Sequence, residues 1–205
     1  MRALSTSDVP LESLRELSLD LSSDLELEVD ERQIELRAAE PPSWVTFLAN
    51  GDWWLKAFAA YSALYVAEIV KEAAKGTWKN RGKALTAVRA ATTGIKKLAA
   101  GIAKLRQRLS PRTRIAMGLP IPDDYFATSL DLLGSDPDDL AFQIALFVHH
   151  LPGLTTLIES EGLQQGRVLG AMRLKLQQDA SLEVSWMDKD SFTQHRKVLP
   201  LEDPA

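Results

Sequence analysis

The chain of 205 residues contains no cysteine. That absence excludes disulfide bonds, cysteine nucleophiles and cysteine-ligated zinc, and it is typical of proteins kept in a reducing compartment. The N-terminal residues also lack the apolar run of a secretory signal, since acidic side chains appear early. We therefore expect a cytoplasmic protein, with membrane association as the alternative.

Motifs of catalysis and cofactor binding are missing as well. The sequence has no G-x-S-x-G elbow, no phosphate-binding G-x-x-x-x-G-K loop, no G-x-G-x-x-G fingerprint and no H-E-x-x-H zinc motif. Paired aspartates could bind a hard cation or share acid–base work, and they occur at Asp123–Asp124 and at Asp188 and Asp190. Aspartates are also ordinary turn residues. We therefore expect a non-enzymatic protein with no metal or cofactor, and a small hydrolase using Asp123 and Asp124 is an alternative.

The chain has three histidines, His149, His150 and His195. Adjacent side chains on a helix project about 100° apart, so His149 and His150 are poorly placed to ligate one metal ion. We interpret them as partly exposed residues at a helix end, where a charged imidazole interacts favourably with the helix dipole.

Acidic residues are absent from one long segment. Residues 73–122 contain no Asp or Glu but hold 12 of the 24 Lys and Arg residues, whereas residues 1–40 carry 11 acidic and 4 basic side chains. The formal net charge of −4 therefore hides a strong asymmetry. Such a split favours an anionic partner for the basic segment, or pairing with acidic residues of the same protein.

The basic segment supplies the candidate residues for binding an anionic partner. They project away from an apolar helical seam or lie near its ends: Lys79, Arg81, Lys83, Arg89, Lys96, Lys97, Lys104, Arg106 and Arg108. Such a face could neutralise nucleic-acid phosphates, lie on anionic lipid, or pair with the acidic residues 16–40 of the same or another copy. No base-reading motif is present, and no aromatic residue lies between Trp78 and Tyr125 to stack on single-stranded bases.

The most apolar stretch, residues 53–74, predicts a helix that is apolar nearly all round. No charged residue lies between Lys56 and Glu68. A helix of this kind is either buried or in lipid, and a membrane span needs roughly 20 mostly apolar residues. Because the uncharged run is shorter than that, we favour a buried helix. Its aromatic side chains are the candidates for self-association: Trp53, Trp54, Phe58, Tyr61 and Tyr65.

Residues 84–109 show the most regular helical pattern in the chain. Apolar residues recur at alternating spacings of four and three, which is typical of a coiled-coil-like seam. Gly94 and Gly101 form a neighbouring row, and glycine inside a helix indicates that another element approaches closely. We therefore predict a long two-helix hairpin over residues 52–109, with a single bent helix as the alternative.

The remaining segments predict strands and one more helix. Residues 14–36 alternate apolar and polar positions and predict a three-stranded meander, and residues 168–198 predict a second one. Residues 43–50 predict a short helix capped by Ser43. Strands are expected at residues 115–119 and 126–132. The next helix is expected to begin at Asp136 and to break at Pro152–Gly153, with a further turn or two to Ser160 and Gly162 as a C-terminal stop. The element order is βββ-αα-ββ-α-βββ.

This order predicts an α+β fold in which two antiparallel β meanders pack with the long hairpin. We expect residues 1–205 to form a single domain, with loose termini at residues 1–13 and 201–205. The expected function is that of an interaction or regulatory protein. It would form a homo-oligomer through the hairpin and present its basic face to an acidic protein surface, an anionic membrane or nucleic acid. A membrane-active effector, whose residues 45–109 insert into or lie on anionic lipid, is the alternative.

Overall fold

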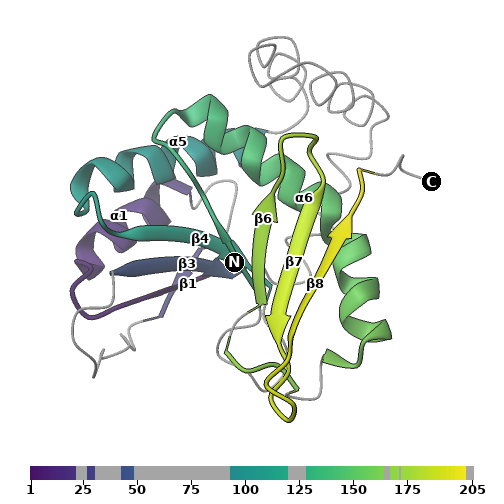
Figure 1. The fold of residues 1–205 in the computed structure, drawn as a ribbon. Helices are drawn as coiled ribbons and strands as arrows, with labels where there is room; N and C mark the ends of the chain where they lie inside the picture. Colours follow the sequence, from purple (N-terminus) through teal and green to yellow (C-terminus); the bar gives the residue numbers. More distant parts are fainter. Residues whose placement is uncertain are drawn as a thin grey trace.

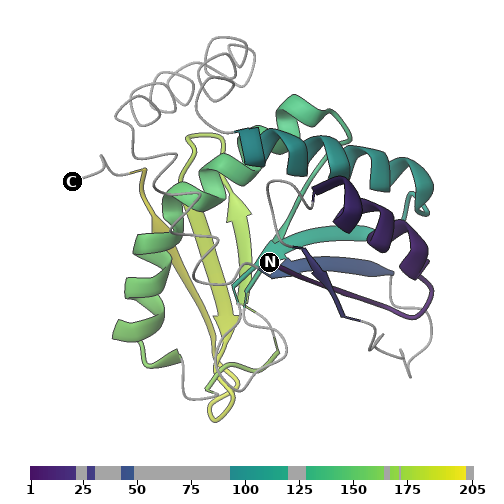
Figure 2. The same cartoon turned by 180° about the vertical axis from the view of Figure 1, so that it is seen from behind.

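In the computed structural model, the described residues form an eight-stranded mixed sheet with three helices against one of its faces (Figure 1 and Figure 2). The structure describes residues 1–21, 27–30, 43–48, 93–119, 128–163, 167–170 and 172–201. The predicted mixture of helices and strands is confirmed. The predicted order of elements differs in the first third of the chain.

The strands lie in the order β2-β1-β3-β4-β5-β6-β7-β8, so β2 and β8 are the two edges. Their bounds are β1 Arg2–Ser5, β2 Glu28–Val29, β3 Trp44–Leu48, β4 Arg114–Gly118, β5 Thr128–Asp131, β6 Met172–Leu176, β7 Leu182–Met187 and β8 Gln194–Leu199. The sheet is strongly twisted, since β3 and β4 lie across the view of Figure 1 whereas β6, β7 and β8 stand upright in it.

Each parallel pair of strands is joined by a segment that contains a helix. β1 pairs with β2, β3 with β4, and β5 with β6 in parallel. The helices between them in sequence are α1 (Leu11–Leu21), α5 (Thr93–Arg108) and α6 (Pro137–Ser160). Parallel neighbours require such crossovers. All three helices lie on the same side, so no helix of the described part covers the other face (Figure 2).

Helix α6 lies at the centre of the core. Asp136 Oδ1 accepts hydrogen bonds from the backbone N–H groups of Asp138 and Asp139, and Pro137 is the first helical residue, as the sequence predicts. Residues 140–148 are all buried. The sheet and α5 both pack against α6 and cover its apolar surface.

Among the described helices, α6 alone is long and apolar enough to cross a membrane. Within its most apolar window of 18 residues, 72% is buried inside the protein. A helix at the centre of a folded core has the same composition as a span, and α6 occupies such a position.

The described half of the predicted seam is buried, and α5 packs between α1 and α6. The apolar positions of this half of the seam are each at most 9% exposed: Ile95, Leu98, Ile102, Leu105 and Leu109. Gly101 faces α1, where an added Cβ would lie 2.3 Å from Leu17 Cδ1. Gly101 therefore makes room for a side chain of α1, whereas the sequence predicts the close approach of another backbone, that of the first helix of the hairpin, which lies outside the described residues.

The N-terminal prediction of loose residues 1–13 is wrong for β1. Ala3 and Leu4 are buried, and β1 hydrogen-bonds to β2 on one side and to β3 on the other. Four residues are too few for a clear alternating pattern. Their place inside the sheet comes from pairing with strands that are distant in sequence.

The predicted strand after residue 14 is a helix. In α1, Leu14, Leu17 and Leu21 are buried whereas Leu19 is 74% exposed. The buried set recurs at spacings of three and four, which is helical, and Leu19 mimics a spacing of two. Packing of α1 against α5 decides between the two periods.

Residues 43–50, predicted as a short helix, contain β3. Its Trp-Val-Thr-Phe-Leu sequence is rich in aromatic and β-branched residues, which favour strands. Ser43 does not cap a helix, because the strand β3 begins at the next residue. Its hydroxyl donates a hydrogen bond to Asp8. That bond and a second from Thr6 lower the pKa of the Asp8 carboxyl.

Helix α6 runs unbroken through Pro152, where the sequence predicts a break before a further turn or two to Ser160. A proline inside a helix removes one backbone hydrogen bond, but Leu154, Leu157 and Ile158 beyond it are buried and keep the chain helical to Ser160. Gly162, with φ +63°, follows as the predicted stop.

In the last third of the chain, β6, β7 and β8 are consecutive antiparallel neighbours. β6 begins at Met172, whereas the sequence predicts a strand that already includes Val168. The predicted helix at residues 53–74, and with it most of the hairpin at 52–109, lies outside the described residues. The same is true of residues 202–205 in the C-terminal segment.

Candidate functional site

Polar and charged side chains line the sheet face that lies opposite the helices. The strand registers place Ser129 on β5, Arg173 on β6, Ser185 on β7 and Arg196 on β8 directly opposite one another. Neighbouring strands lie about 4.8 Å apart, so these four side chains form one row across the face. Arg173 lies between the two serines.

Two cavities on this face meet at the row. One has a volume of about 530 Å³ and extends toward β3, and the other has a volume of about 740 Å³ and extends toward the start of α6. Five residues line both cavities: Arg114, Ser129, Asp131, Arg173 and Ser185. We call the two cavities joined at these residues the sheet groove.

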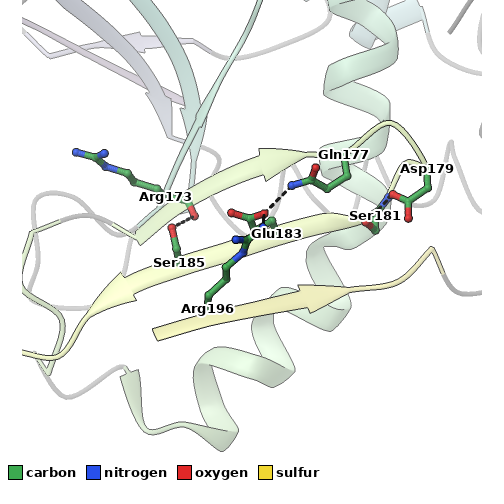
Figure 3. A network of polar contacts seen from close by, with 7 residues as sticks. All are labelled: Arg173, Gln177, Asp179, Ser181, Glu183, Ser185 and Arg196. Atoms are coloured by element: carbon green, nitrogen blue, oxygen red, sulfur yellow. Dashed lines mark hydrogen bonds and ion pairs between the residues drawn. The ribbon is translucent and has the colours of Figure 1, made fainter. Parts of the chain in front are cut away.

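Two arginines beside the groove are neutralised by carboxylates. Arg114 Nη2 donates to both oxygens of Asp131 at 2.7 Å and 2.6 Å. Arg196 donates to Glu183 Oε2, which also accepts a hydrogen bond of 2.6 Å from Gln177 Nε2 (Figure 3). Both carboxylates are thus already engaged.

Arg173 differs from these two arginines. Its side chain is exposed, and within the part of the chain that the structure describes it has no carboxylate partner. Figure 3 shows the guanidinium extending away from the contacts around Glu183. Lys175, two residues further along β6 on the same face, also lacks an ion pair in the described ranges. The face therefore carries an excess of positive charge along β6.

The hydroxyl groups on either side complete the surroundings of Arg173. Ser185 Oγ donates to the Arg173 carbonyl oxygen at 3.5 Å, which is long for a hydrogen bond and easily exchanged. A guanidinium presents a planar fork of N–H donors that matches a carboxylate or a phosphate. One uncompensated arginine between two hydroxyls is suited to binding an anion.

The cations predicted on the helical face are partly neutralised within the chain. Lys104 Nζ lies 3.3 Å from Asp20 Oδ2, and Arg108 pairs with Glu16. Both acidic residues belong to α1. Arg106 Nη2 donates to the Leu132 carbonyl at 2.6 Å. Internal pairing, the alternative to an external anionic partner, therefore applies to Lys104 and Arg108.

The other predicted residues divide into two groups. Lys96 is half-buried and Lys97 is exposed on α5. Outside the described residues lie Lys79, Arg81, Lys83, Arg89, Trp53, Trp54, Phe58, Tyr61, Tyr65, Asp123 and Asp124. Their roles stay predictions.

The interpretation of both adjacent histidines as partly exposed residues at a helix end is wrong for His150. This residue is 4% exposed, lies in the interior of α6, and its Nε2–H donates to the Ala180 carbonyl at 2.7 Å. Burial lowers the pKa of His150 to about 4, and the neighbouring His149 acts in the same direction. His150 is therefore neutral at pH 7 and ties α6 to the turn between β6 and β7.

The aspartates of the last turn are used in that turn. Asp188 Oδ1 accepts hydrogen bonds from the backbone of Asp190 and Ser191 and from the Ser191 hydroxyl. The bonds from Ser191 lower the pKa of Asp188. Within the described ranges, no three His, Asp or Glu side chains are grouped to hold a metal ion.

Sequence reasoning missed Arg173, Ser129 and Ser185. The Met-Arg-Leu-Lys-Leu sequence of β6 does contain a usable signal, because alternation places Arg173 and Lys175 on the polar face. The neighbouring serines carry no such signal. Only the register of strands that are far apart in sequence brings them together.

Comparison with protein-family models, with curated proteins and with solved structures gives no match for the chain. Functional inference therefore rests on the chemistry of its own side chains.

Proposed function

We propose that the protein is a non-enzymatic binding protein whose sheet groove holds a small anionic molecule through Arg173. One observation carries the proposal: an exposed guanidinium lies where two cavities meet, and no described carboxylate neutralises it. The hydroxyls of Ser129 and Ser185 on the adjacent strands supply further hydrogen bonds to an anion.

Binding suits this groove better than catalysis does. A general base needs a free acceptor near the substrate, but Asp131 and Glu183 already accept hydrogen bonds from arginines. Of the described histidines, His150 is buried in α6 and His195 stacks on Trp186, with ring centroids 5.3 Å apart. Among the described residues, neither Ser129 nor Ser185 makes a hydrogen bond to a carboxylate or a histidine.

Sodium acetate, titrated into the protein, tests the proposal. The Nε–Hε signals of arginine side chains are followed by NMR and assigned with Arg173→Lys and Arg112→Lys variants. We expect the Arg173 signal to shift and to saturate, because the bound carboxylate accepts its protons. Arg112 lies in a turn outside both cavities and provides the internal control.

An unchanged Arg173 signal would contradict the proposal. Equal shifts of all arginine signals would contradict it too, since they would indicate only nonspecific screening of charge.

Self-association through the hairpin at residues 52–109 is a separate proposal. Its support is the sequence alone, because the apolar surface of residues 53–74 exceeds what one neighbouring helix covers. We expect light scattering to give a mass above that of a single 22.7 kDa chain. A monomer at every concentration, with residues 53–109 protected from hydrogen exchange, would contradict this proposal.

The membrane-active alternative has less support. Helix α6 is long enough to span a bilayer but is mostly buried in the protein, and two cations of α5 are paired with α1. Flotation with anionic vesicles separates the two possibilities, because the binding proposal predicts that the protein stays in the dense fraction.

A further inference from the structure

We infer that the ligand of the sheet groove is an organic carboxylate that carries an apolar group. This inference rests on the proposed function and specifies the chemistry of the anion. It follows from the side chains at one end of the groove and from the amount of positive charge at its centre.

One end of the groove is apolar. Leu169 is 45% exposed and Met187 is 38% exposed, which makes them two of the large apolar residues that the described part leaves open to solvent. Both line the same cavity as Trp44 and Arg173. Single exposed apolar residues are common, but two neighbouring ones that line one cavity indicate a surface that binds apolar groups.

The backbone holds this apolar end in place. The Leu169 N–H donates to the Met187 carbonyl at 2.8 Å, and the Lys189 N–H donates to the Arg167 carbonyl at 2.7 Å. Val168 also forms a bridge with Asp188. Residues 167–170 are thus fixed beside the end of β7, so the apolar end does not need to assemble when a ligand arrives.

The apolar end and the cation are within reach of one ligand. Ser185 is directly opposite Arg173, and Met187 is two residues further along β7 on the same face. Two residues of a strand span about 7 Å. An alkyl chain of a few carbons, or one aromatic ring, therefore reaches from the guanidinium to Met187.

The charge at the centre favours a carboxylate over a phosphate. Arg173 supplies one positive charge and a fork that binds two oxygens, which matches the single charge of a carboxylate. Lys175 lies on the opposite side of Arg173 from Met187, because β6 and β7 are antiparallel. A ligand whose apolar group points toward Met187 therefore extends away from Lys175. A phosphate dianion in that position would contact Arg173 alone, which neutralises only one of its two negative charges.

Isothermal titration calorimetry with four small molecules tests the inference. Sodium octanoate has both the charge and the chain, acetate has the charge alone, 1-octanol has the chain alone, and inorganic phosphate is the competing anion. We expect octanoate to bind at least about tenfold more tightly than each of the others, because burial of methylene groups adds to the contact with Arg173.

Two variants separate the halves of the groove. Arg173→Gln should reduce octanoate affinity to that of 1-octanol and abolish acetate binding. Leu169→Ser with Met187→Ser should reduce octanoate affinity toward that of acetate and leave acetate binding unchanged. Phe192→Ser removes an apolar side chain that is 69% exposed and lies outside both cavities, and it is the control. Circular dichroism verifies that each variant is folded.

The outcomes distinguish this inference from the proposed function. If acetate still shifts the Arg173 signal but octanoate binds no better than acetate, the ligand class is wrong and the anion site stands. Tighter binding of phosphate, or octanoate binding unaffected by the double serine variant, would also overturn the ligand class. If neither acetate nor octanoate binds, both proposals fall.

Discussion

The two faces of the sheet use the same strands for different purposes. On the helix side, the five successive strands β3 to β7 contribute Phe47, Met117, Leu130, Leu174 and Val184, all of which are at most 5% exposed. On the other side, the single strand β6 presents two charged side chains, Arg173 and Lys175, to solvent. Because side chains alternate along a strand, one sequence supplies a packed core and a polar groove at once. The core stabilises the fold, and the groove is the surface for which we propose binding.

The face without described helices is itself divided. Near β1, β3 and β4, its residues Leu4, Thr46 and Ala116 are buried. Near β6, β7 and β8, its residues are mostly exposed. Gly118 lies at the border, where an added Cβ would be 2.0 Å from the Thr128 carbonyl oxygen. The sheet groove spans this border, because Thr46 and Ala116 line the same cavity as Arg173.

The comparison predicts opposite outcomes for two adjacent residues of β5. Leu130→Ala should lower the free energy of unfolding by about 2–5 kcal/mol, because it leaves a cavity in the core. Ser129→Ala should change it by no more than about 0.5 kcal/mol. Urea denaturation followed by circular dichroism measures both. Similar losses for the two variants would contradict the division of roles between the faces.

Acid should destabilise the helix-covered side through His150. The pKa of His150 is about 4 in the folded state and 6.5 in an unfolded chain. The unfolded chain therefore binds a proton first as the pH falls. The stability that neutral His150 contributes is fully present above pH 6.5 and is lost as the pH falls toward 4. Each pKa unit corresponds to about 1.4 kcal/mol, so the loss reaches about 3 kcal/mol. We expect a shallower loss of stability over this range in His150→Gln than in the wild type.

His195→Gln is the control for that experiment, because His195 is an exposed residue of β8. If this variant altered the acid dependence as much as His150→Gln, the assignment to His150 would be wrong.

Removing a carboxylate from the groove should sharpen the comparison. Asp131→Asn frees Arg114 from an exposed ion pair, so the free energy of unfolding should change by less than about 1 kcal/mol. Affinity for octanoate should rise by about threefold, because a second cation becomes available. Asp190→Asn, a charge change in the turn after β7, is the matched control. A loss of affinity in Asp131→Asn would indicate that the ion pair itself forms part of the site.

The smallest effect is expected at the surface between α1 and α5. Glu16→Gln with Asp20→Asn removes the partners of Arg108 and Lys104, at about 0.2–1 kcal/mol per exposed pair. The freed cations should increase flotation with phosphatidylserine vesicles. Equal vesicle binding by the wild type would show that α5 already presents an available basic face.

The sequence predicts best where the signal is local. The Asp136-Pro137 start of α6 needs only neighbouring residues, and so does the alternation of Met172, Leu174 and Leu176 in β6. Pro152 is also a local signal, yet burial of the residues beyond it outweighs one lost hydrogen bond.

Predictions that depend on distant partners fail or cannot be made. The leucines of α1 fit two periods, and only contact with α5 selects the helix. The sequence predicts a partly exposed His150, because only the folded structure shows that α6 packs against the turn at Ala180. The row of Ser129, Arg173 and Ser185 requires the strand order and the register, neither of which the sequence states.

The most direct test of the division between the two faces is a map of backbone amide shifts during titration with sodium octanoate. We predict saturable shifts concentrated at residues 128–131, 169–175 and 184–187, with α5 unchanged. Shifts centred on residues 96–108 of α5, or no saturable shifts at all, would contradict the assignment of binding to the sheet face opposite the helices.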